Sequence, residues 1–327
     1  MNIENSVEKL GYVDTEIDSS LNLVEEIARL KEQKQAVILA HYYQPAEIQA
    51  IADFVGDSLA LSQKAATLNK PLILFAGVRF MAETAKILAP QSKVLLPDLN
   101  AGCSLADSCD YESFRKFVEQ YPEHKVITYV NTTAEIKSLS YVCCTSSNAV
   151  QVVNSIPANE PIIFAPDRNL GSYIQRLTNR SNMLIWDGAC HVHDQFSVKR
   201  ILELKRQHPS AKVIAHPECK QPVLLISDYV GSTAQLLKYT QECAENEFIV
   251  ATEPGIFTEM MRANPGKTYI PAPPDDSSCA CNECSYMKLT TLKKMYLTLK
   301  YELPEISVSP ELAVLARKPI ERMLKIS

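Results

Sequence analysis

Three features that mark other protein classes are missing from this chain of 327 residues. No apolar run approaches the ~18 residues of a transmembrane helix. Lysine and arginine form no run and the net charge is −5, so a role on nucleic acid or on a membrane surface has little support. The N-terminal segment, residues 1–5, is polar and acidic. We therefore expect no signal or transit peptide.

Glycine-rich phosphate-binding loops of the types G-x-G-x-x-G and G-x-x-x-x-G-K-S/T are also absent. The chain has no dense ferredoxin-type run of cysteines, which argues against an electron carrier. Ten cysteines without a secretory signal are more typical of thiols or metal ligands in a reducing compartment than of a disulfide framework. These absences predict a cytoplasmic protein.

What the sequence does contain is an internal repeat. Each of three apolar, β-branched runs ends, at a predicted strand end, with a residue whose side chain carries a polar ring: His41, Tyr129 and His216. The separations between these residues are 88 and 87. A hydroxyl follows each ring 17 residues later, and a cysteine follows a third apolar run in each copy. Such self-similarity indicates three pseudo-equivalent units, with one site at a pseudo-threefold axis.

The fold class follows from the alternation of short β-branched runs with helical stretches, which is typical of βαβ units and parallel sheets. We predict an α/β protein of three α/β/α units with short parallel sheets around a pseudo-threefold axis. Ligands gather at the carboxyl ends of such strands, where the rings and cysteines fall. The predicted segments are a leader and helix (1–34), three units (35–110, 111–195 and 196–284) and C-terminal helices that pack back on the body (285–327).

The three hydroxyls, Ser58, Ser146 and Thr233, each precede a predicted helix and are predicted N-caps. Capping alone would explain any single one of them. Three equivalent helix N-termini, however, offer unpaired N–H groups and partial positive charge to an anion. They would suit a substrate with several anionic groups.

The rings begin three short segments in which the first and third residues share a face. A lone histidine at a strand end is usually a hydrogen-bonded core residue, whereas an equivalent set supplies acids and bases near neutral pH. A carboxylate such as Glu218 beside His216 could remove a carbon-bound proton. The segments are His41-Tyr42-Tyr43, Tyr129-Val130-Asn131 and His216-Pro217-Glu218.

One cysteine per unit would make a three-thiolate site with an open fourth position. Cys103 and Cys190 lie 87 residues apart, and the last unit offers Cys279, Cys281 and Cys284. Thiolate ligands favour zinc or an iron–sulfur cluster. The remaining cysteines lack this placement, and we interpret them as small buried side chains: Cys109, Cys143, Cys144, Cys219 and Cys243.

Eight sequence blocks together resemble the signature blocks of the quinolinate synthase family, in order, from about residue 35 to residue 300. They are His41-Tyr42-Tyr43-Gln44, Ala52-Asp53-Phe54-Val55-Gly56-Asp57-Ser58, Asn100-Ala101-Gly102-Cys103-Ser104-Leu105-Ala106-Asp107, Tyr129-Val130-Asn131-Thr132, Trp186-Asp187-Gly188-Ala189-Cys190, His216-Pro217-Glu218-Cys219, Gly231-Ser232-Thr233 and Cys284-Ser285-Tyr286-Met287-Lys288.

The resemblance implies three stacked α/β units and one [4Fe–4S] cluster with an open iron, held by Cys103, Cys190 and Cys284. Some family members carry Cys-x-x-Cys-x-x-Cys in the last block, whereas this chain has Cys279-x-Cys281-x-x-Cys284. Cys281 is therefore a minor alternative to Cys284.

The implied reaction condenses iminosuccinate with dihydroxyacetone phosphate to give quinolinate, phosphate and two waters in NAD biosynthesis. An aspartate oxidase or dehydrogenase would supply the imine. The implied catalytic residues are His41, Tyr43, His216 and Glu218, with His193 a weaker candidate. The implied substrate-binding residues are His41, Ser58, Tyr129, Val130, Asn131, Ser146, His216, Pro217, Glu218 and Thr233.

Two alternatives share these ligands. One is a hydro-lyase that uses a [4Fe–4S] Lewis acid on a single small carboxylic acid. The other is a non-enzymatic iron–sulfur or zinc protein. Quinolinate formation from both substrates would exclude the first, and metal analysis with a visible spectrum would test the second.

Overall fold

A computed structural model describes residues 3–276 and 282–326 of the chain. The chain forms two compact units. The first comprises the chain up to Cys103 together with Ser285–Arg317, and the second comprises Ser104–Cys284 together with the chain from Lys318. Among the described helices, none is both long and apolar enough to cross a membrane.

Three four-stranded parallel sheets repeat one strand order, in which the first strand of each set lies between the second and third. This arrangement confirms the predicted α/β fold with three repeated units, each built on a short parallel sheet. The sheets are β2-β1-β3-β4, formed by Phe54–Gly56, Ala36–His41, Leu72–Ala76 and Lys93–Leu95; β6-β5-β7-β8, formed by Val142–Cys144, Lys125–Tyr129, Ile162–Ala165 and Met183–Ile185; and β10-β9-β11-β12, formed by Tyr229–Val230, Lys212–Ala215, Glu247–Ala251 and Thr268–Pro271.

The repeat extends to single hydrogen bonds. In each sheet, a backbone N–H just before the edge strand donates to a carbonyl of the first strand. The three bonds are Asp53 N to Ile38 O (2.9 Å), Tyr141 N to Val126 O (2.8 Å) and Asp228 N to Val213 O (2.7 Å). The same local geometry therefore recurs at the spacing that the sequence predicts.

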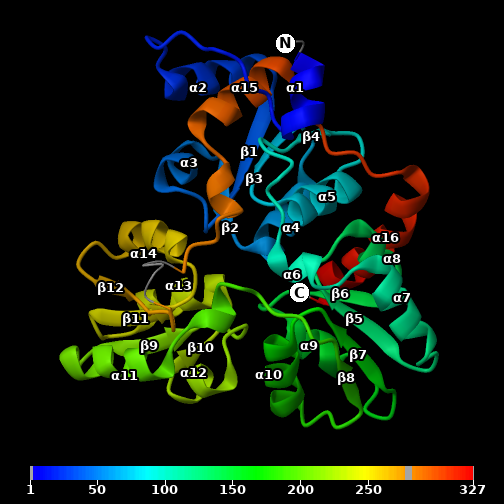
Figure 1. The fold of residues 1–327 in the computed structure, drawn as a ribbon, viewed down its shortest axis with the longest axis vertical. Coiled ribbons are helices and arrows are strands. Elements are labelled where there is room, and N and C mark those ends of the chain that lie inside the picture. The colour runs from blue at the N-terminus through cyan, green and yellow to red at the C-terminus, as the bar shows by residue number, and fades with distance from the viewer. Residues whose placement is uncertain (1–2, 277–281, 327) are drawn as a thin grey trace. The chain divides into compact units, whose positions relative to one another are not determined.

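Helices cover both faces of the first sheet (Figure 1). One face buries Ile38 and Leu74 against α2, α3 and α15, while α4 and α5 lie on the other. The helices of this unit are α1 (Ile3–Leu10), α2 (Leu23–Gln33), α3 (Ala46–Ile51), α4 (Ser58–Thr67), α5 (Arg79–Leu88) and α15 (Leu292–Tyr301), with the 3-10 helix η3 (Met287–Leu289).

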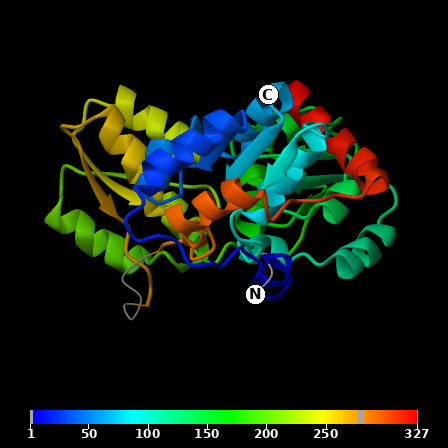
Figure 2. The same cartoon turned by 90° about the horizontal axis from the view of Figure 1, so that it is seen from above.

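The other two sheets are covered in the same way. In the third sheet, α11 and α12 pack on the face of Val213 and Ile249, and α13 and α14 lie on the opposite face (Figure 2). The helices of the second unit are α6 (Ser104–Asp107), α7 (Tyr111–Glu119), α8 (Ala134–Ser138), α9 (Ala149–Asn154), α10 (Arg168–Thr178), α11 (Val198–Gln207), α12 (Gln221–Leu225), α13 (Thr233–Glu242) and α14 (Phe257–Ala263), with the 3-10 helices η1 (His193–Gln195) and η2 (Pro254–Ile256).

Each of the three predicted α/β ranges contains one of the sheets. The predicted tail, residues 285–327, is divided: α15 belongs to the first unit, and α16 (Pro310–Ile326) begins in the first unit and ends in the second. The domain boundaries themselves stay a prediction.

Candidate active site

The first strand of each sheet ends at a polar ring. β1 ends at His41, β5 at Tyr129, and β9 at the residue before His216. The two histidines share a local fold, because each Nδ1 accepts the backbone N–H two residues further on, from Tyr43 (3.1 Å) and from Glu218 (3.4 Å). The rings therefore lie where the sequence predicts them, at the carboxyl ends of parallel strands.

A buried carboxylate, Glu218, lies at the centre of a cluster in the second unit, with only 2% of its surface exposed. Its Oε1 accepts the Tyr129 hydroxyl (2.6 Å), and its Oε2 lies 3.1 Å from His193 Nδ1. His216 Nδ1 lies 3.6 Å from Oε1, and its ring stacks on His193 with centroids 4.6 Å apart. Four groups that can move protons thus lie together in one buried cluster.

The charge on Glu218 is fixed by these neighbours. Burial alone would raise its pKa, but the adjacent His193 and His216 and the hydrogen bonds from His193 and Tyr129 lower the pKa to about 2. Asp167, which is buried close by, shows the opposite shift: burial, followed by the negative charge of Glu218, raises its pKa well above the ordinary value. The site therefore keeps Glu218 ionised and disfavours a second buried charge.

His193 also contacts Cys190, one of the predicted metal-binding cysteines. Its Nδ1 lies 3.3 Å from Cys190 Sγ, and its Nε2 lies 2.9 Å from Thr252 Oγ1. The donor atoms of Cys190, His193 and Glu218 all fall within 4.8 Å of one another, so this group could hold a metal ion. A thiol, an imidazole and a carboxylate are ligands that transition metals accept.

The predicted N-caps are wrong by one or two residues. Asp57 and Ser232 cap α4 and α13, and Ser58 and Thr233 are the first helical residues after them. Asn148 precedes α9 without a side-chain cap bond. Neighbouring polar residues compete for each cap, and backbone conformation selects the residue with extended dihedrals, as at Asp57 and Ser232.

Ser146 contacts the cluster, and Asn131, two residues after Tyr129, offers a buried polar atom. Ser146 Oγ lies 3.2 Å from His216 Nε2. Asn131 Oδ1 is buried and has no hydrogen-bond partner among the described residues. A buried amide oxygen without a partner is costly unless a ligand satisfies it. This atom is consistent with a polar ligand in the second unit.

The first unit holds the other predicted residues: His41, Tyr43, Ser58 and Cys103. The His41 and Tyr43 rings meet edge to face with centroids 4.5 Å apart, and both are buried. Lys288 Nζ donates to Tyr43 O (2.7 Å) and Gln44 Nε2 to Met287 O (2.9 Å). Two of the blocks that carry the family resemblance therefore pack against each other within this unit.

The cysteines divide by exposure. Cys103, Cys190 and Cys284 are partly exposed, whereas Cys109, Cys143, Cys144 and Cys219 are buried, as predicted. The prediction for Cys243 is wrong, because this residue is partly exposed and its thiol donates to Glu245 Oε2 (2.8 Å). Cys279 and Cys281 lie outside the described residues.

Sequence reasoning missed four polar residues close to this cluster. Thr252 lies one residue past the end of β11 and Asp167 two residues past the end of β7, and a search for polar side chains after every strand would have found them. Ser104 and His191 each follow a predicted metal-binding cysteine, and Ser104 Oγ lies 2.7 Å from His191 Nδ1. Their equal spacing from Cys103 and Cys190 was a signal in the repeat itself.

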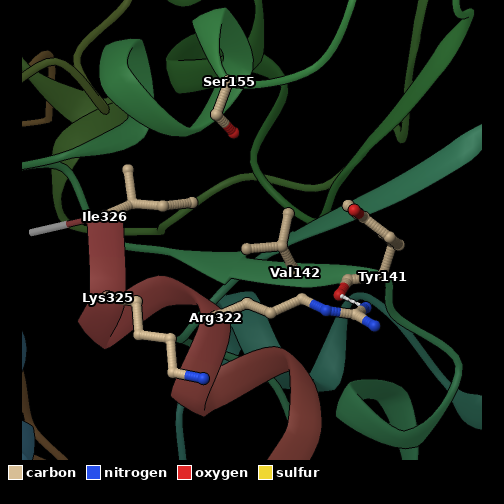
Figure 3. A pocket seen from close by; sticks show the side chains of 6 residues that line it. All are labelled: Tyr141, Val142, Ser155, Arg322, Lys325 and Ile326. Atoms are coloured by element: carbon tan, nitrogen blue, oxygen red, sulfur yellow. Dashed lines mark hydrogen bonds between the residues drawn. The ribbon is translucent and has the colours of Figure 1, made fainter.

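One cavity of about 230 Å³ lies elsewhere in the second unit (Figure 3). It is lined by Tyr141, Val142, Ser155, Arg322, Lys325 and Ile326, none of which is a predicted site residue. The Arg322 guanidinium lies over the Tyr141 ring, 4.2 Å from its centroid, and donates to the Tyr141 carbonyl. These contacts attach the end of α16 to the edge of the second sheet.

Comparison with known proteins agrees with the resemblance in the sequence. The family model described as quinolinate synthetase A protein matches residues 25–325. Relatives named quinolinate synthase include one from Synechococcus sp., 56% identical over 310 residues (95% of this chain and 97% of the relative). The relative from Microcystis aeruginosa is 58% identical over 301 residues (92% and 94%), and that from Thermosynechococcus vestitus 56% over 307 (94% and 96%). The chain therefore belongs to the quinolinate synthase family, the enzymes that make quinolinate in NAD biosynthesis.

Proposed function

We propose that this chain makes quinolinate by condensing iminosuccinate with dihydroxyacetone phosphate, releasing phosphate and two waters. Family membership supports the product, and the buried cluster around Glu218 is the observation that carries the chemistry. Tyr129, Glu218, His193 and Cys190 form a continuous series of contacts at 2.6, 3.1 and 3.3 Å. This series joins acid–base groups to a metal-binding thiol, as a multistep condensation and dehydration requires.

Cys103, Cys190 and Cys284 are the proposed ligands of one [4Fe–4S] cluster with an open iron. Their partial exposure, against the burial of four other thiols, suits metal-ligating groups. The hydrogen bond between Ser104 and His191, which directly follow two of the proposed ligands, also supports the assignment. When bound, the cluster would supply a Lewis acid to a substrate oxygen or nitrogen.

Proton transfer is assigned to His193 and His216, with Glu218 as their charge partner. A carboxylate with a pKa of about 2 is a weak base, so Glu218 by itself would accept a carbon-bound proton poorly. An imidazole can both donate and accept a proton, and Glu218 contacts both rings, at 3.1 Å from His193 Nδ1 and 3.6 Å from His216 Nδ1. His41 and Tyr43 are assigned the corresponding role in the first unit.

Substrate carboxylates and phosphate are assigned to the helix N-termini and to the polar groups beside them. Ser58 and Thr233 begin helices of 10 residues each, whose first N–H groups have no intrahelical partner. Tyr129, Asn131 and Ser146 add neutral donors or acceptors, and Val130 and Pro217 shape the adjacent backbone. The imine would come from an aspartate oxidase or dehydrogenase, and the cytoplasm is the proposed location.

Single replacements of the proposed ligands test the assignment. Cys103→Ser, Cys190→Ser and Cys284→Ser should each be colourless and inactive after anaerobic reconstitution, apart from residual colour in Cys284→Ser if Cys281 substitutes. Cys243→Ser is the matched control, since Cys243 is also partly exposed, and it should stay brown and active. Supplying both substrates and measuring quinolinate distinguishes the condensation from a hydro-lyase. A fully active, metal-free wild type would contradict the proposal.

A further inference from the structure

Two buried carboxyl groups occupy equivalent places in the second and third sheets. Asp167 and Glu253 each lie two residues beyond the end of a central strand, β7 or β11. Both side chains are completely buried, and both cap the helix that follows. The equivalent cap in the first unit, at the start of α5, is Val78, which has no side-chain oxygen.

Asp167 lies between the cap of α10 and the segment that contains Cys190. Its Oδ1 accepts Leu170 N (2.7 Å) in the first turn of α10, whereas its Oδ2 is buried and has no hydrogen-bond partner among the described residues. The nearby backbone N–H of Cys190 acts to lower the pKa of the carboxyl, against the larger effect of burial. The segment before this cysteine is attached to the same turn, because Gly188 N donates to Pro166 O (3.1 Å). A β-carbon at Gly188 would lie 2.5 Å from Pro166 O. A residue larger than glycine therefore does not fit where this segment approaches the turn at Pro166.

Glu253 repeats the arrangement with a longer side chain. Its Oε2 accepts Gly255 N (2.6 Å) in η2, and its Oε1 accepts Cys284 N (3.4 Å). One oxygen thus caps a helical turn while the other holds the main chain of a proposed cluster ligand. In the second and third sheets alike, a single buried carboxyl group thus lies between a helical cap and the main chain of a proposed ligand.

We propose that Asp167 and Glu253 are positioning residues for the metal centre, which fix the main chain of Cys190 and Cys284. The inference rests on the proposed cluster. A backbone N–H that bonds to a carboxyl oxygen is not available to a thiolate sulfur, and hydrogen bonds to cluster sulfurs raise the reduction potential. The two carboxyl groups therefore keep the ligand loops in place and keep the cluster potential low.

The first unit holds the same loop position without a carboxyl group at the cap. Arg79 N donates to Ala101 O (2.7 Å) just as Arg168 N donates to Gly188 O (2.8 Å), and Asp98 Oδ1 accepts Asn100 N (2.9 Å) within the loop. Val78, at the cap, has no side-chain oxygen that could take the place of Asp167 or Glu253. The role is consequently assigned to two of the three proposed ligands.

Asp167→Ser and Glu253→Gln test the role in the reconstituted holoenzyme. Serine is as good an N-cap as aspartate, but it is too short to serve a second N–H as well. Glutamine keeps the size of glutamate and has one acceptor oxygen for two N–H groups. Asp110→Ser is the matched control, because Asp110 caps α7 through Ser113 N (3.0 Å) in the same unit.

Cluster midpoint potential and the rate of iron release to a chelator are the readouts. Asp167→Ser and Glu253→Gln should shift the potential to more positive values and release iron about 10-fold faster, whereas Asp110→Ser should match the wild type in both. A purely structural role would lower the melting temperature without moving the potential.

Wild-type potential and iron release in both variants would overturn the inference while leaving the proposed cluster intact. A colourless, metal-free but active wild type would instead overturn the proposed function. If Asp167→Ser fails to fold, Glu253→Gln decides the question, since the capped turn η2 has only three residues.

Discussion

At the scale of single residues, Glu218 shows how environment sets chemistry. The same side chain on a protein surface would titrate near 4.5, but here its pKa is about 2 because burial is outweighed by two histidines and two hydrogen bonds. Its Oε2 lies 3.1 Å from His193 Nδ1, so a fixed negative charge is held beside an imidazole ring.

Replacing Glu218 with glutamine removes that charge and keeps the size of the side chain. We expect kcat to fall by about 100-fold or more, because the two histidines lose the negatively charged partner that they contact. The visible spectrum of the reconstituted protein should remain that of the wild type. Near-full activity in anaerobic quinolinate assays would remove Glu218 from the proton-transfer steps.

The depressed pKa also makes a prediction about stability. A group whose pKa falls from 4.5 to about 2 on folding stabilises the protein above pH 4.5 and loses that contribution as the pH drops toward 2. The free energy of unfolding in urea should therefore differ between wild type and Glu218→Gln at neutral pH by more than at about pH 3. A difference that stays constant with pH would mean that Glu218 is not ionised in the folded state.

Buried thiols should be chemically inert in the folded protein. Burial raises the pKa of Cys109 to about 12 and that of Cys144 and Cys219 well above the ordinary value, and only the thiolate is nucleophilic. Native protein treated with iodoacetamide should be modified at Cys243 and not at these three, as measured by peptide mass spectrometry. Equal labelling of Cys144 and Cys243 would contradict this.

At the scale of the helix, capping and the proposed binding role at the start of α4 belong to two adjacent residues. Asp57 accepts Ala60 N (2.9 Å) as the cap of α4, whereas Ser58 is the first residue of the helix. Asp57→Ala should lower the free energy of unfolding by about 1 kcal/mol. Ser58→Ala should leave it nearly unchanged and should weaken quinolinate binding, measured by calorimetry. Equal destabilisation by both would show that Ser58 has a structural role only.

Helix α15 follows the third sheet in the sequence but packs against the first sheet, where it completes the core of the first unit. Met295 is fully buried there against β1 and α2, while Lys293 on the outer side pairs with Asp14 at 3.1 Å. Met295→Ala should cost about 2–5 kcal/mol, and the control Lys293→Ala less than about 1 kcal/mol. Urea unfolding followed by circular dichroism measures both; similar costs would place α15 outside the core.

At the scale of the whole chain, the two compact units each have their own core. The only tryptophan in the sequence, Trp186, belongs to the second unit, where its Nε1 donates to Ser108 O (2.9 Å) and its ring meets Phe114 edge to face. Tryptophan fluorescence therefore reports the second unit alone, and circular dichroism reports both.

Destabilising one unit should then separate the two signals. In Met295→Ala, we expect the urea midpoint to fall by circular dichroism and to stay near that of the wild type by fluorescence, because each core unfolds with its own unit. Coincident midpoints in the variant would show that the two units unfold as one.

The sequence by itself determined the fold class, the threefold repeat and the ring at each strand end, because hydrophobic period and spacing are local properties. It also determined the family, through blocks such as those at His41 and Cys190. The caps were decided by backbone dihedrals, which select Asp57 over Ser58 although both can cap a helix.

Only the tertiary structure decided which side chains meet. Glu218, His193, Tyr129 and Thr252 come from separate segments, and their contacts depend on how the second and third sheets pack within one unit. The roles of Asp167 and Glu253 depend on the same packing, since each joins the end of one strand to a cysteine more than 20 residues further along the chain. Contacts between residues so far apart in the sequence produce no periodic pattern in it. They are selected in the folded protein, where buried polar groups need hydrogen-bond partners.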